Sequence, residues 1–219
     1  MSGPLDPAAT PPTPGVSAWN VANALTALRL VLVPVFGVML LHEDGQDLAW
    51  RIAAAGVFLV AVFTDRLDGE LARSRGLVTD IGKIADPIAD KALMGTALVG
   101  LSIIGELPWW VTIVILLREI GITILRFVVI RHGVMPAGRG GKVKTAVQSL
   151  AIGLFVLPLT GWGHDAAWIV MLVAVVVTVV TGVDYVVQAR RLVASSDRTA
   201  RKRAERAASR PAAVDRTRP

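Results

Sequence analysis

Residues 65–90 read DRLDGELARSRGLVTDIGKIADPIAD, and this stretch interrupts apolar sequence on both sides. The flanking residues 52–64 and 92–104 are apolar enough to lie in lipid. Four of its aspartates form two closely spaced pairs: Asp65 with Asp68, and Asp86 with Asp90. A carboxylate at membrane depth is costly unless it is paired or bound to a metal ion. The sequence therefore predicts a polar site that holds a cation within a membrane protein.

The composition also indicates a polytopic membrane protein. The chain has 219 residues, of which 53% are hydrophobic, and its mean hydropathy is +0.59. Such values are far from those of a soluble domain. The absence of cysteine excludes disulfides, thiolate nucleophiles and Cys-ligated zinc, and the three histidines fall in predicted loops, where we interpret them as solvated. A metal ion here should therefore be one that prefers oxygen ligands, such as magnesium or manganese.

The formal net charge of +6 comes from one end of the chain. Ten of the 23 Lys and Arg residues, but only three of the 17 Asp and Glu residues, lie from Arg190 onward. A nucleic-acid partner is not expected, because the sequence shows neither a recognised binding module nor basic residues interleaved with aromatics. We interpret residues 191–219 as a basic cytoplasmic tail, partly disordered, that lies near anionic lipid headgroups.

The sequence predicts an all-α protein with six transmembrane helices. Residues 1–16 form a Pro-rich leader that we expect to be disordered, residues 17–190 a membrane domain, and residues 191–219 the tail. Each apolar segment is close to the roughly 20 residues that a spanning helix needs. The predicted segments are residues 22–41, 48–73, 84–104, 108–130, 145–162 and 166–187.

The loops between these segments predict the orientation in the membrane. The loops after the first, third and fifth segments (HEDGQD, GEL and GWGHD) contain no Lys or Arg. Those after the second and fourth (RSRGLVTDIGK and RHGVMPAGRGGKVK) are rich in them, as is the tail. By the positive-inside rule, both termini and both basic loops face the cytoplasm.

The spacing of the aspartates predicts two carboxylate pairs. The first two are three residues apart and the last two are four apart, so each pair shares one face of a helix. We expect the pairs to meet across an antiparallel helix pair near the cytoplasmic surface. Small residues beside the pairs leave room for a bulky anionic ligand: Gly69, Ala72 and Gly82. Pro87 is tolerated in a first helical turn and would kink a helix deeper inside.

This density of carboxylates suits the displacement of a phosphate group. Four carboxylates can hold two divalent ions, which neutralise pyrophosphate oxygens. One acid could remain free to take a proton from an attacking hydroxyl. The alternative is a charged hairpin, in which the acids pair with neighbouring cations: Arg66, Arg73, Arg75 and Lys83.

The stretch resembles the signature of the CDP-alcohol phosphotransferases, D-x2-D-G-x2-A-R-x8-G-x3-D-x3-D. All fixed positions are present: Asp65, Asp68, Gly69, Ala72, Arg73, Gly82, Asp86 and Asp90. The resemblance extends over residues 20–187. It implies a six-helix enzyme of the bacterial plasma membrane, usually a homodimer, with its active site facing the cytoplasm. Such enzymes transfer a phosphatidyl group from a CDP-linked lipid to an alcohol and release CMP.

The resemblance also implies roles for the signature residues. The four aspartates would bind two ions of Mg²⁺ or Mn²⁺, and Asp90 would be the base that deprotonates the acceptor. The small residues would let the cytidine and its ribose approach the backbone: Gly69, Ala72 and Gly82. Arg73 would pair with the pyrophosphate, because its planar fork matches phosphate oxygens.

Three further segments resemble bacterial phosphatidylglycerophosphate synthases. Residues 20–29, NVANALTALR, resemble the N-I-P-N-x-L-T-x-x-R start of those enzymes, with Ala22 in place of the proline. The pair Arg118-Glu119 and residues 141–145, GKVKT, resemble the same subfamily.

Four cations suit an acceptor that carries its own phosphate, such as glycerol 3-phosphate. Three are expected near the cytoplasmic mouth of the site and the fourth, Arg126, two turns deeper: Arg118, Lys142, Lys144 and Arg126. Positive-inside charge is the alternative for the lysines. For Arg118 the alternative is a salt bridge with Glu119 or another helix.

The expected reaction transfers phosphatidate from CDP-diacylglycerol to glycerol 3-phosphate, giving phosphatidylglycerophosphate and CMP. Inositol, inositol phosphate or phosphatidylglycerol are alternative acceptors for the same chemistry. A divalent-cation transporter would need a polar track toward the outer leaflet, whereas residues 52–63 and 94–104 are apolar. A non-catalytic scaffold would be expected to have lost a signature aspartate, and this chain keeps all four.

Overall fold

A computed structural model describes residues 21–75, 79–130 and 139–208. Within these ranges, the side chains of residues 22, 66–75, 80–81, 83, 139–140, 142 and 195–208 are outside the description. The described part of the chain contains helices and no strand, which confirms the all-α prediction. The elements are α1 (Val21–Leu41), the 3-10 helix η1 (His42–Gly45), α2 (Leu48–Arg75), α3 (Asp80–Ile103), α4 (Trp109–Val129), α5 (Arg139–Val156) and α6 (Trp162–Ala208).

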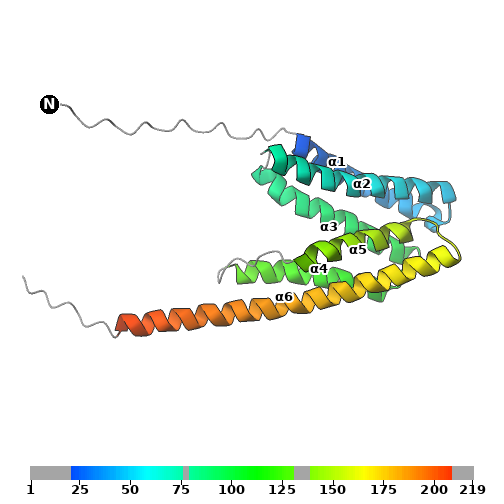
Figure 1. The fold of residues 1–219 in the computed structure, drawn as a ribbon. Coiled ribbons are helices and arrows are strands. Elements are labelled where there is room, and N and C mark those ends of the chain that lie inside the picture. The colour runs from blue at the N-terminus through cyan, green and yellow to red at the C-terminus, as the bar shows by residue number, and fades with distance from the viewer. Residues whose placement is uncertain (1–20, 76–78, 131–138, 209–219) are drawn as a thin grey trace, which may run out of the picture.

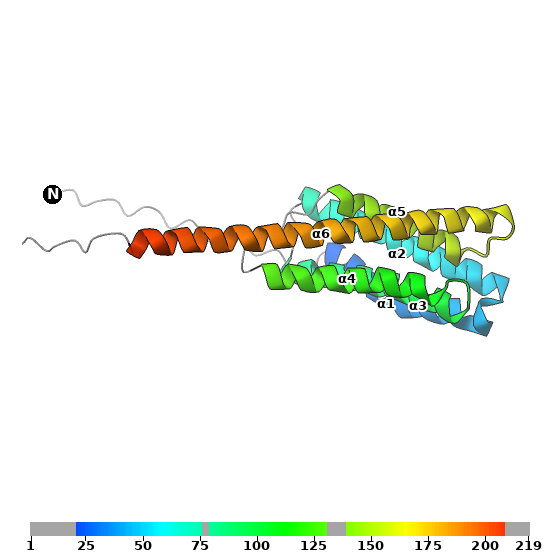
Figure 2. The same ribbon diagram turned by 90° about the horizontal axis from the view of Figure 1, so that it is seen from below.

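Successive helices run in opposite directions, so their ends gather at two ends of the molecule (Figure 1). α1, α3 and α5 start at the end where α2, α4 and α6 finish, and we call this the site end. α1 packs along both α2 and α3, whereas α2 and α3 make few direct contacts with each other. α6 packs along α4 and α5 (Figure 2). α1 therefore joins the two helices that carry the signature aspartates.

The last two helices differ most from their predicted bounds. α5 begins at Arg139 and ends at Val156, two residues before Pro158, because a residue that precedes proline disfavours helical geometry. α6 has 47 residues, about 70 Å of helix, and continues past the predicted tail boundary to Ala208. Its final turns are rich in Ala, Arg, Lys and Glu, which are strong helix formers.

Three candidate membrane spans are present among the described residues. They are residues 23–45, 48–65 and 162–194, each long and apolar enough to cross a membrane. α3 and α4 carry charged residues within their length, and the apolar part of α5 is short, at residues 143–156. α3 and α4 thus differ from the candidate spans by their number of charged residues, and α5 by the length of its apolar part. Charged side chains within a membrane protein commonly mark a functional site.

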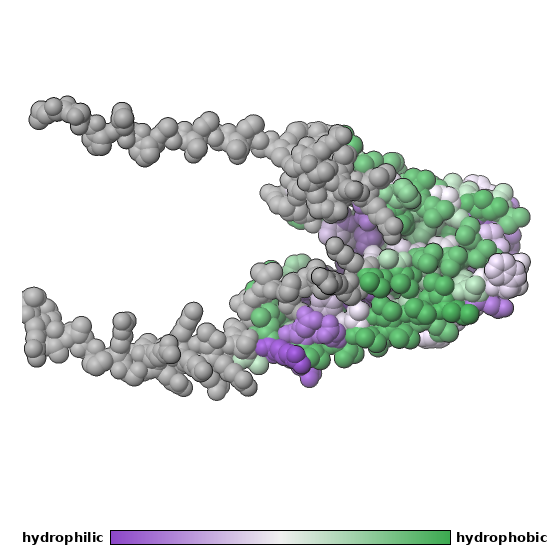
Figure 3. All heavy atoms as spheres, viewed as in Figure 1, coloured by the Kyte–Doolittle hydropathy of each residue, from purple (hydrophilic) through white to green (hydrophobic). Residues whose placement is uncertain are grey.

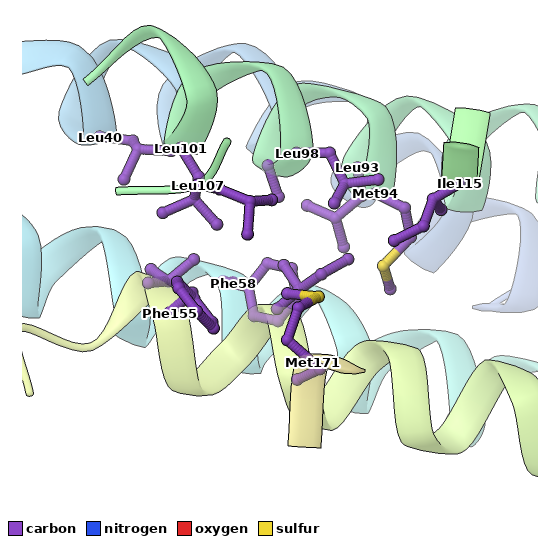
Figure 4. Close-up of a cluster of buried hydrophobic side chains, with 14 of the residues drawn as sticks. Leu40, Phe58, Leu93, Met94, Leu98, Leu101, Leu107, Ile115, Phe155 and Met171 are labelled. Atoms are coloured by element: carbon purple, nitrogen blue, oxygen red, sulfur yellow. The ribbon is translucent and has the colours of Figure 1, made fainter. Parts of the chain in front are cut away.

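One apolar core joins the helices. Phe58 of α2 and Met171 of α6 are almost completely buried, and Figure 4 shows side chains from both sides of the bundle meeting there. The labelled core residues are Leu40, Phe58, Leu93, Met94, Leu98, Leu101, Leu107, Ile115, Phe155 and Met171. This core holds α3 and α4 against α2, α5 and α6.

The outer surface is also apolar. Large side chains such as Val38, Phe63 and Phe127 are 66–71% exposed. In Figure 3 hydrophobic residues cover most of the described surface in this view, whereas hydrophilic residues lie in the hollow that opens at the site end, on the lower edge and at the opposite end. A soluble monomer rarely exposes so much contiguous apolar surface, so this exterior fits a lipid environment.

Arg51 holds the bundle together at the end opposite the site. Its Nε donates to the carbonyl oxygen of Val156 at 3.2 Å and its Nη2 to that of Phe155 at 3.0 Å. Its Nη1 donates to Glu106 Oε1 at 3.0 Å and to the Gly45 carbonyl at 3.2 Å. The guanidinium thus satisfies the carbonyls at the end of α5 and ties that helix to two loops.

Candidate active site

Carboxylates from α2 and α3 line one cleft at the site end. Asp65, in the half of α2 nearer the site end, and Asp86 and Asp90 of α3 share a cavity of about 530 Å³. We call it the carboxylate cleft. Its full lining is Asp65, Asp86, Pro87, Asp90, Lys91, Thr123, Arg126, Phe127, Ile130 and Thr145. The structure therefore brings three of the four predicted aspartates into one cavity.

Asp65 is held by an arginine of α1. Arg29 Nη1 lies 2.6 Å from Asp65 Oδ1, and the Arg29 side chain is completely buried. Asp65 lies directly after the apolar run of α2, at the point where the sequence becomes polar. The ion pair gives this carboxylate a fixed cationic partner while 41% of its side chain stays exposed.

Asp86 is held by the same helix. The hydroxyl of Thr26, itself only 2% exposed, donates to Asp86 Oδ1 at 2.5 Å. One turn earlier on α1, Asn23 Oδ1 accepts a hydrogen bond from the Thr79 hydroxyl at 2.9 Å. Thr79 is the N-cap of α3, because its hydroxyl accepts from the backbone N–H of Gly82 at 3.0 Å. The start of α3 is thereby fixed against α1.

Gly82 is buried where α1 meets α3. A Cβ at this position would lie 2.8 Å from Asn23 Oδ1 and 3.2 Å from Thr79 Oγ1. The contact with α1 therefore gives a packing reason for this glycine, in addition to the predicted approach of cytidine. α3 begins early enough to include Gly82 as a helical residue, as the aspartate spacing requires.

Pro87 lies inside α3, seven residues after its first residue, Asp80. It is therefore not in the first turn. Proline has no N–H to donate, so the carbonyl of residue 83 lacks its usual helical partner at this point. Pro87 also lines the carboxylate cleft between Asp86 and Asp90.

Asp90 connects the carboxylate cleft to a second cavity, of about 270 Å³, between α3, α4 and α5. We call this second cavity the lysine pocket. Asp90, Lys91 and Thr145 line both spaces. The remaining lining of the lysine pocket is Ala92, Met94, Gly95, Leu98, Leu116, Glu119, Ile120, Lys144, Gln148 and Ser149. A ligand in this pocket would lie beside the Asp90 carboxylate.

Lys144 enters the lysine pocket from α5 and is only 5% exposed. Its ammonium forms a short ion pair with Glu119 Oε1 of α4. The same oxygen accepts from Arg118 Nη1 at 3.1 Å, so one carboxylate serves two cations. The pairing of Arg118 with Glu119 was the alternative to a role in acceptor binding, and the structure contains it.

Arg118 and Arg126 of α4 both contact Tyr185 of α6. Their Cζ atoms are 5.7 Å and 5.0 Å from the ring centroid, within the range of cation–π attraction. Arg126 Nη2 also donates to the Tyr185 hydroxyl at 2.9 Å, and Arg118 Nη2 to Thr181 Oγ1 at 3.1 Å. Both arginines are thus held against α6.

The expected depth of these two arginines was wrong. α4 ends at Val129 at the site end, and Arg126 lies in its last turn, where it lines the carboxylate cleft. Arg118 lies two turns further from that end and lines a groove between α4 and α6, outside both the cleft and the lysine pocket. α4 runs toward the site end, so Arg126, the later of the two residues, lies nearer that end than Arg118.

Several predicted site side chains fall outside the described residues. They are Asp68, Gly69, Ala72 and Arg73 on the last turns of α2, and Lys142 on the first turn of α5. The backbone places the first four directly after Asp65 on the same helix. Their predicted roles, and that of Lys142, stay predictions.

The oxygen donors of the cleft suit a hard divalent cation such as Mg²⁺ or Mn²⁺. Asp65, Asp86 and Asp90 line one space, and no thiol or imidazole lines it. Among the residues whose side chains are described, no three acidic or histidine side chains lie close enough to enclose an ion. The side chain of Asp68, the fourth predicted ligand, is not among the described ones. The three described carboxylates have the donor chemistry that the predicted ions require.

Sequence reasoning assigned no site role to four residues that the structure places at or beside the site: Thr26, Arg29, Glu119 and Tyr185. The first two belong to the stretch 20–29, which was interpreted only as a subfamily resemblance. Their polar side chains in an apolar helix were the available signal. Tyr185 is the only tyrosine of the chain, and nothing in its position alone indicated a contact with two arginines.

The fold and the cleft define a helical membrane protein with carboxylates from two helices facing a shared cavity. Residues 19–180 match the family model described as CDP-alcohol phosphatidyltransferase. The chain belongs to this family.

Named relatives agree with this assignment. The chain is 56% identical over 181 residues to a probable phosphatidylglycerophosphate synthase of Mycobacterium tuberculosis, covering 83% of this chain and 87% of the relative. It is 36% identical over 180 residues to the CDP-diacylglycerol–glycerol-3-phosphate 3-phosphatidyltransferase of Bacillus subtilis, covering 76% and 93%. It is 32% identical over 187 residues to a CMP-forming cardiolipin synthase of Streptomyces coelicolor, covering 80% and 84%.

Proposed function

We propose that this protein transfers the phosphatidyl group of CDP-diacylglycerol to glycerol 3-phosphate, giving phosphatidylglycerophosphate and CMP. One juxtaposition carries the proposal: three carboxylates and Arg126 line one cleft, and Asp90 joins that cleft to the pocket of Lys144. The names of the mycobacterial and Bacillus relatives support the choice of donor and acceptor. Family membership favours an enzyme over a cation transporter.

The proposed reaction is one displacement at phosphorus. The acceptor hydroxyl oxygen forms a bond to the phosphorus of the phosphatidyl group, and the bond from that phosphorus to the CMP oxygen breaks. Asp90 takes the proton of the hydroxyl, because its carboxylate lies where the cleft and the lysine pocket meet. CMP leaves with the electron pair of the broken bond.

Two Mg²⁺ or Mn²⁺ ions, when bound, would neutralise the pyrophosphate oxygens of the donor. Asp65, Asp68, Asp86 and Asp90 would hold them. Arg73 would pair with the pyrophosphate, and Gly69, Ala72 and Gly82 would allow the cytidine to approach the backbone.

The acceptor would enter the lysine pocket beside Asp90. Lys144 would exchange part of its pairing with Glu119 for the acceptor phosphate, since Glu119 keeps Arg118 as a second partner. Arg126, at the rim of the carboxylate cleft, and Lys142 would add positive charge. Arg118 lines neither space, so we assign it the positioning of Glu119 in place of direct contact with the phosphate.

We further propose six membrane-spanning helices with both termini and the cleft on the cytoplasmic side of a bacterial plasma membrane. The alternation of basic and non-basic loops supports this orientation, because both basic loops join helices at the site end. Membrane lipids would surround the apolar exterior. A homodimer is part of the same proposal and follows from the family resemblance.

The deciding experiment measures CMP release by the purified full-length protein in detergent with CDP-diacylglycerol. Glycerol 3-phosphate, phosphatidylglycerol, inositol and inositol 1-phosphate are offered separately, each with Mg²⁺ and with excess chelator. The proposal expects metal-dependent CMP release with glycerol 3-phosphate and formation of phosphatidylglycerophosphate. Release with another acceptor, but not with glycerol 3-phosphate, would contradict it.

A second candidate acceptor is phosphatidylglycerol, which would make the protein a cardiolipin-forming enzyme. The similarity to the CMP-forming cardiolipin synthase of Streptomyces coelicolor favours including it. A buried lysine in the acceptor pocket favours the smaller acceptor, whose free phosphate carries more charge than a phosphodiester. Equal amounts of both acceptors in one reaction would reveal the preference.

A further inference from the structure

Three polar side chains of α1 face the helices that carry the aspartates. Asn23, Thr26 and Arg29 are spaced three residues apart, so they form a strip along one side of an otherwise apolar helix. The reaction proposed above gives this strip no role. Its position between α2 and α3 nevertheless determines where the carboxylates of the cleft can lie.

α2 and α3 are held together mainly through α1. It packs along both of them, whereas α2 and α3 make few contacts with each other. The distance between the carboxylate of α2 and those of α3 is therefore set through α1. A shift of either helix against α1 would change the separation of Asp65 from Asp86.

Each member of the strip contacts one of these two helices. Thr26 donates to Asp86 Oδ1 at 2.5 Å, and Arg29 Nη1 lies 2.6 Å from Asp65 Oδ1. Asn23 accepts from the Thr79 hydroxyl at 2.9 Å, at the N-cap of α3. Thr26 and Arg29 are 2% and 0% exposed, so their side chains are confined by packing as well as by these bonds.

We propose that Thr26 and Arg29 are positioning residues, which fix the orientation and separation of Asp86 and Asp65 for divalent-ion binding. The inference rests on the proposed function, which requires those ions. A hydrogen bond to one oxygen of a carboxylate restricts its rotation and leaves the other oxygen available as a ligand. The Arg29 guanidinium, 2.6 Å from Asp65 Oδ1, places a positive charge beside one oxygen of that carboxylate.

The test replaces Thr26 by valine, which keeps the shape of the side chain and removes the hydroxyl. We expect the affinity of the full-length protein for Mn²⁺ to fall about tenfold, the effect typical of losing a partner of a metal ligand. The protein in detergent is titrated with Mn²⁺, and electron paramagnetic resonance measures the Mn²⁺ that remains free, which gives the affinity. Thr26→Ser, which retains the hydroxyl, should restore the affinity. Thermal melting monitors the fold, and Thr26→Ala repeats the measurement if the valine variant folds poorly.

The matched control is Thr112→Val. Thr112 is 1% exposed and also uses its hydroxyl in buried hydrogen bonds, but these join it to Ser102 and to the Leu98 carbonyl, away from the cleft. Its Mn²⁺ affinity should equal that of the wild type. The inference is overturned if wild-type protein binds Mn²⁺ and Thr26→Val binds it within twofold, or if Thr112→Val loses as much affinity.

CMP release separates this inference from the proposed function. Thr26→Val should need a higher Mg²⁺ concentration for half-maximal rate, while its KM for glycerol 3-phosphate at saturating Mg²⁺ stays within twofold of wild type. Wild-type protein that neither binds Mn²⁺ nor releases CMP would overturn the proposed function and this inference together. Normal wild-type activity with unchanged variants would overturn the inference alone.

Discussion

Arg29 lies completely buried against α2 with its Nη1 atom 2.6 Å from Asp65 Oδ1, while 41% of the Asp65 side chain is exposed toward the cleft. One partner of this ion pair thus belongs to the packed interior and the other to the site. A buried charge is tolerated only when it is paired, so the interaction constrains both side chains. Arg29 thus holds the Asp65 carboxylate, which remains accessible from the cleft.

A second buried arginine makes an instructive comparison. Arg51 is 3% exposed and lies 3.0 Å from Glu106 Oε1, but it is at the opposite end of the bundle, where it binds carbonyls and joins loops. Replacing each arginine by lysine keeps the charge and removes the planar fork. The replacement of Arg29 should mainly lower activity, and the replacement of Arg51 should mainly lower stability.

We expect Arg29→Lys to lower the rate of CMP release about tenfold with a small change in melting temperature, because it loosens a carboxylate of the cleft. Arg51→Lys should lower the free energy of unfolding by about 2 kcal/mol, because two or more buried carbonyls lose donors. Its kcat/KM at low temperature should equal the wild-type value. Initial rates and thermal melting of both proteins provide the measurement. Equal losses of activity would show that the two pairs do not differ in role.

Asp90→Asn should nearly abolish turnover. Asparagine has the same shape but cannot accept the acceptor proton, so kcat should fall by about 10²- to 10⁴-fold, the usual contribution of a general base. Binding of CDP-diacylglycerol should remain measurable by equilibrium dialysis. Asp165→Asn, an exposed position in the first turn of α6 at the other end of the bundle, is the control and should retain activity. Near-normal turnover of the Asp90 variant would remove its role as base.

Lys144→Ala should raise the KM for glycerol 3-phosphate more than that for CDP-diacylglycerol. The loss of a charged hydrogen bond to the acceptor phosphate should raise the first KM about tenfold or more, and the second should stay within twofold. Steady-state rates with each substrate varied in turn give the two values. Arg191→Ala, which removes an exposed cation outside both cavities, should change neither. Equal changes in both KM values would show that Lys144 does not bind the acceptor phosphate specifically.

The sequence was sufficient to predict most of the helices and the aspartates that line the carboxylate cleft. The apolar runs predicted α1 to α4 to within a few residues, and aspartate spacing predicted that Asp65, Asp86 and Asp90 face a common space. Local periodicity carries this information, since it depends on residues a few positions apart. The position of α1 between α2 and α3 is different. It brings Thr26 to a residue 60 positions away, which no local pattern encodes.

Two other differences have similarly simple physical causes. Arg126 lies nearer the site end than Arg118, the reverse of the predicted order, because α4 runs toward that end. The length of α6 was underestimated because hydropathy marks where the lipid contact ends, whereas the helix continues as long as its residues favour helical geometry. One error concerns the direction of α4 and the other the length of α6. Neither changes which aspartates line the cleft.

Truncation of the chain after Val193 should leave catalysis largely intact. The part of α6 beyond this residue projects past the other helices in both views (Figures 1 and 2). The contacts that fix α6 to the bundle come earlier, through residues such as Tyr185 and Ala189, which are 5% and 2% exposed. We expect kcat within twofold of the wild type and an unchanged melting temperature. Binding to vesicles with anionic lipid should weaken, because most of the removed charges are basic. A loss of CMP release by the folded truncated protein would instead show that this extension takes part in the reaction.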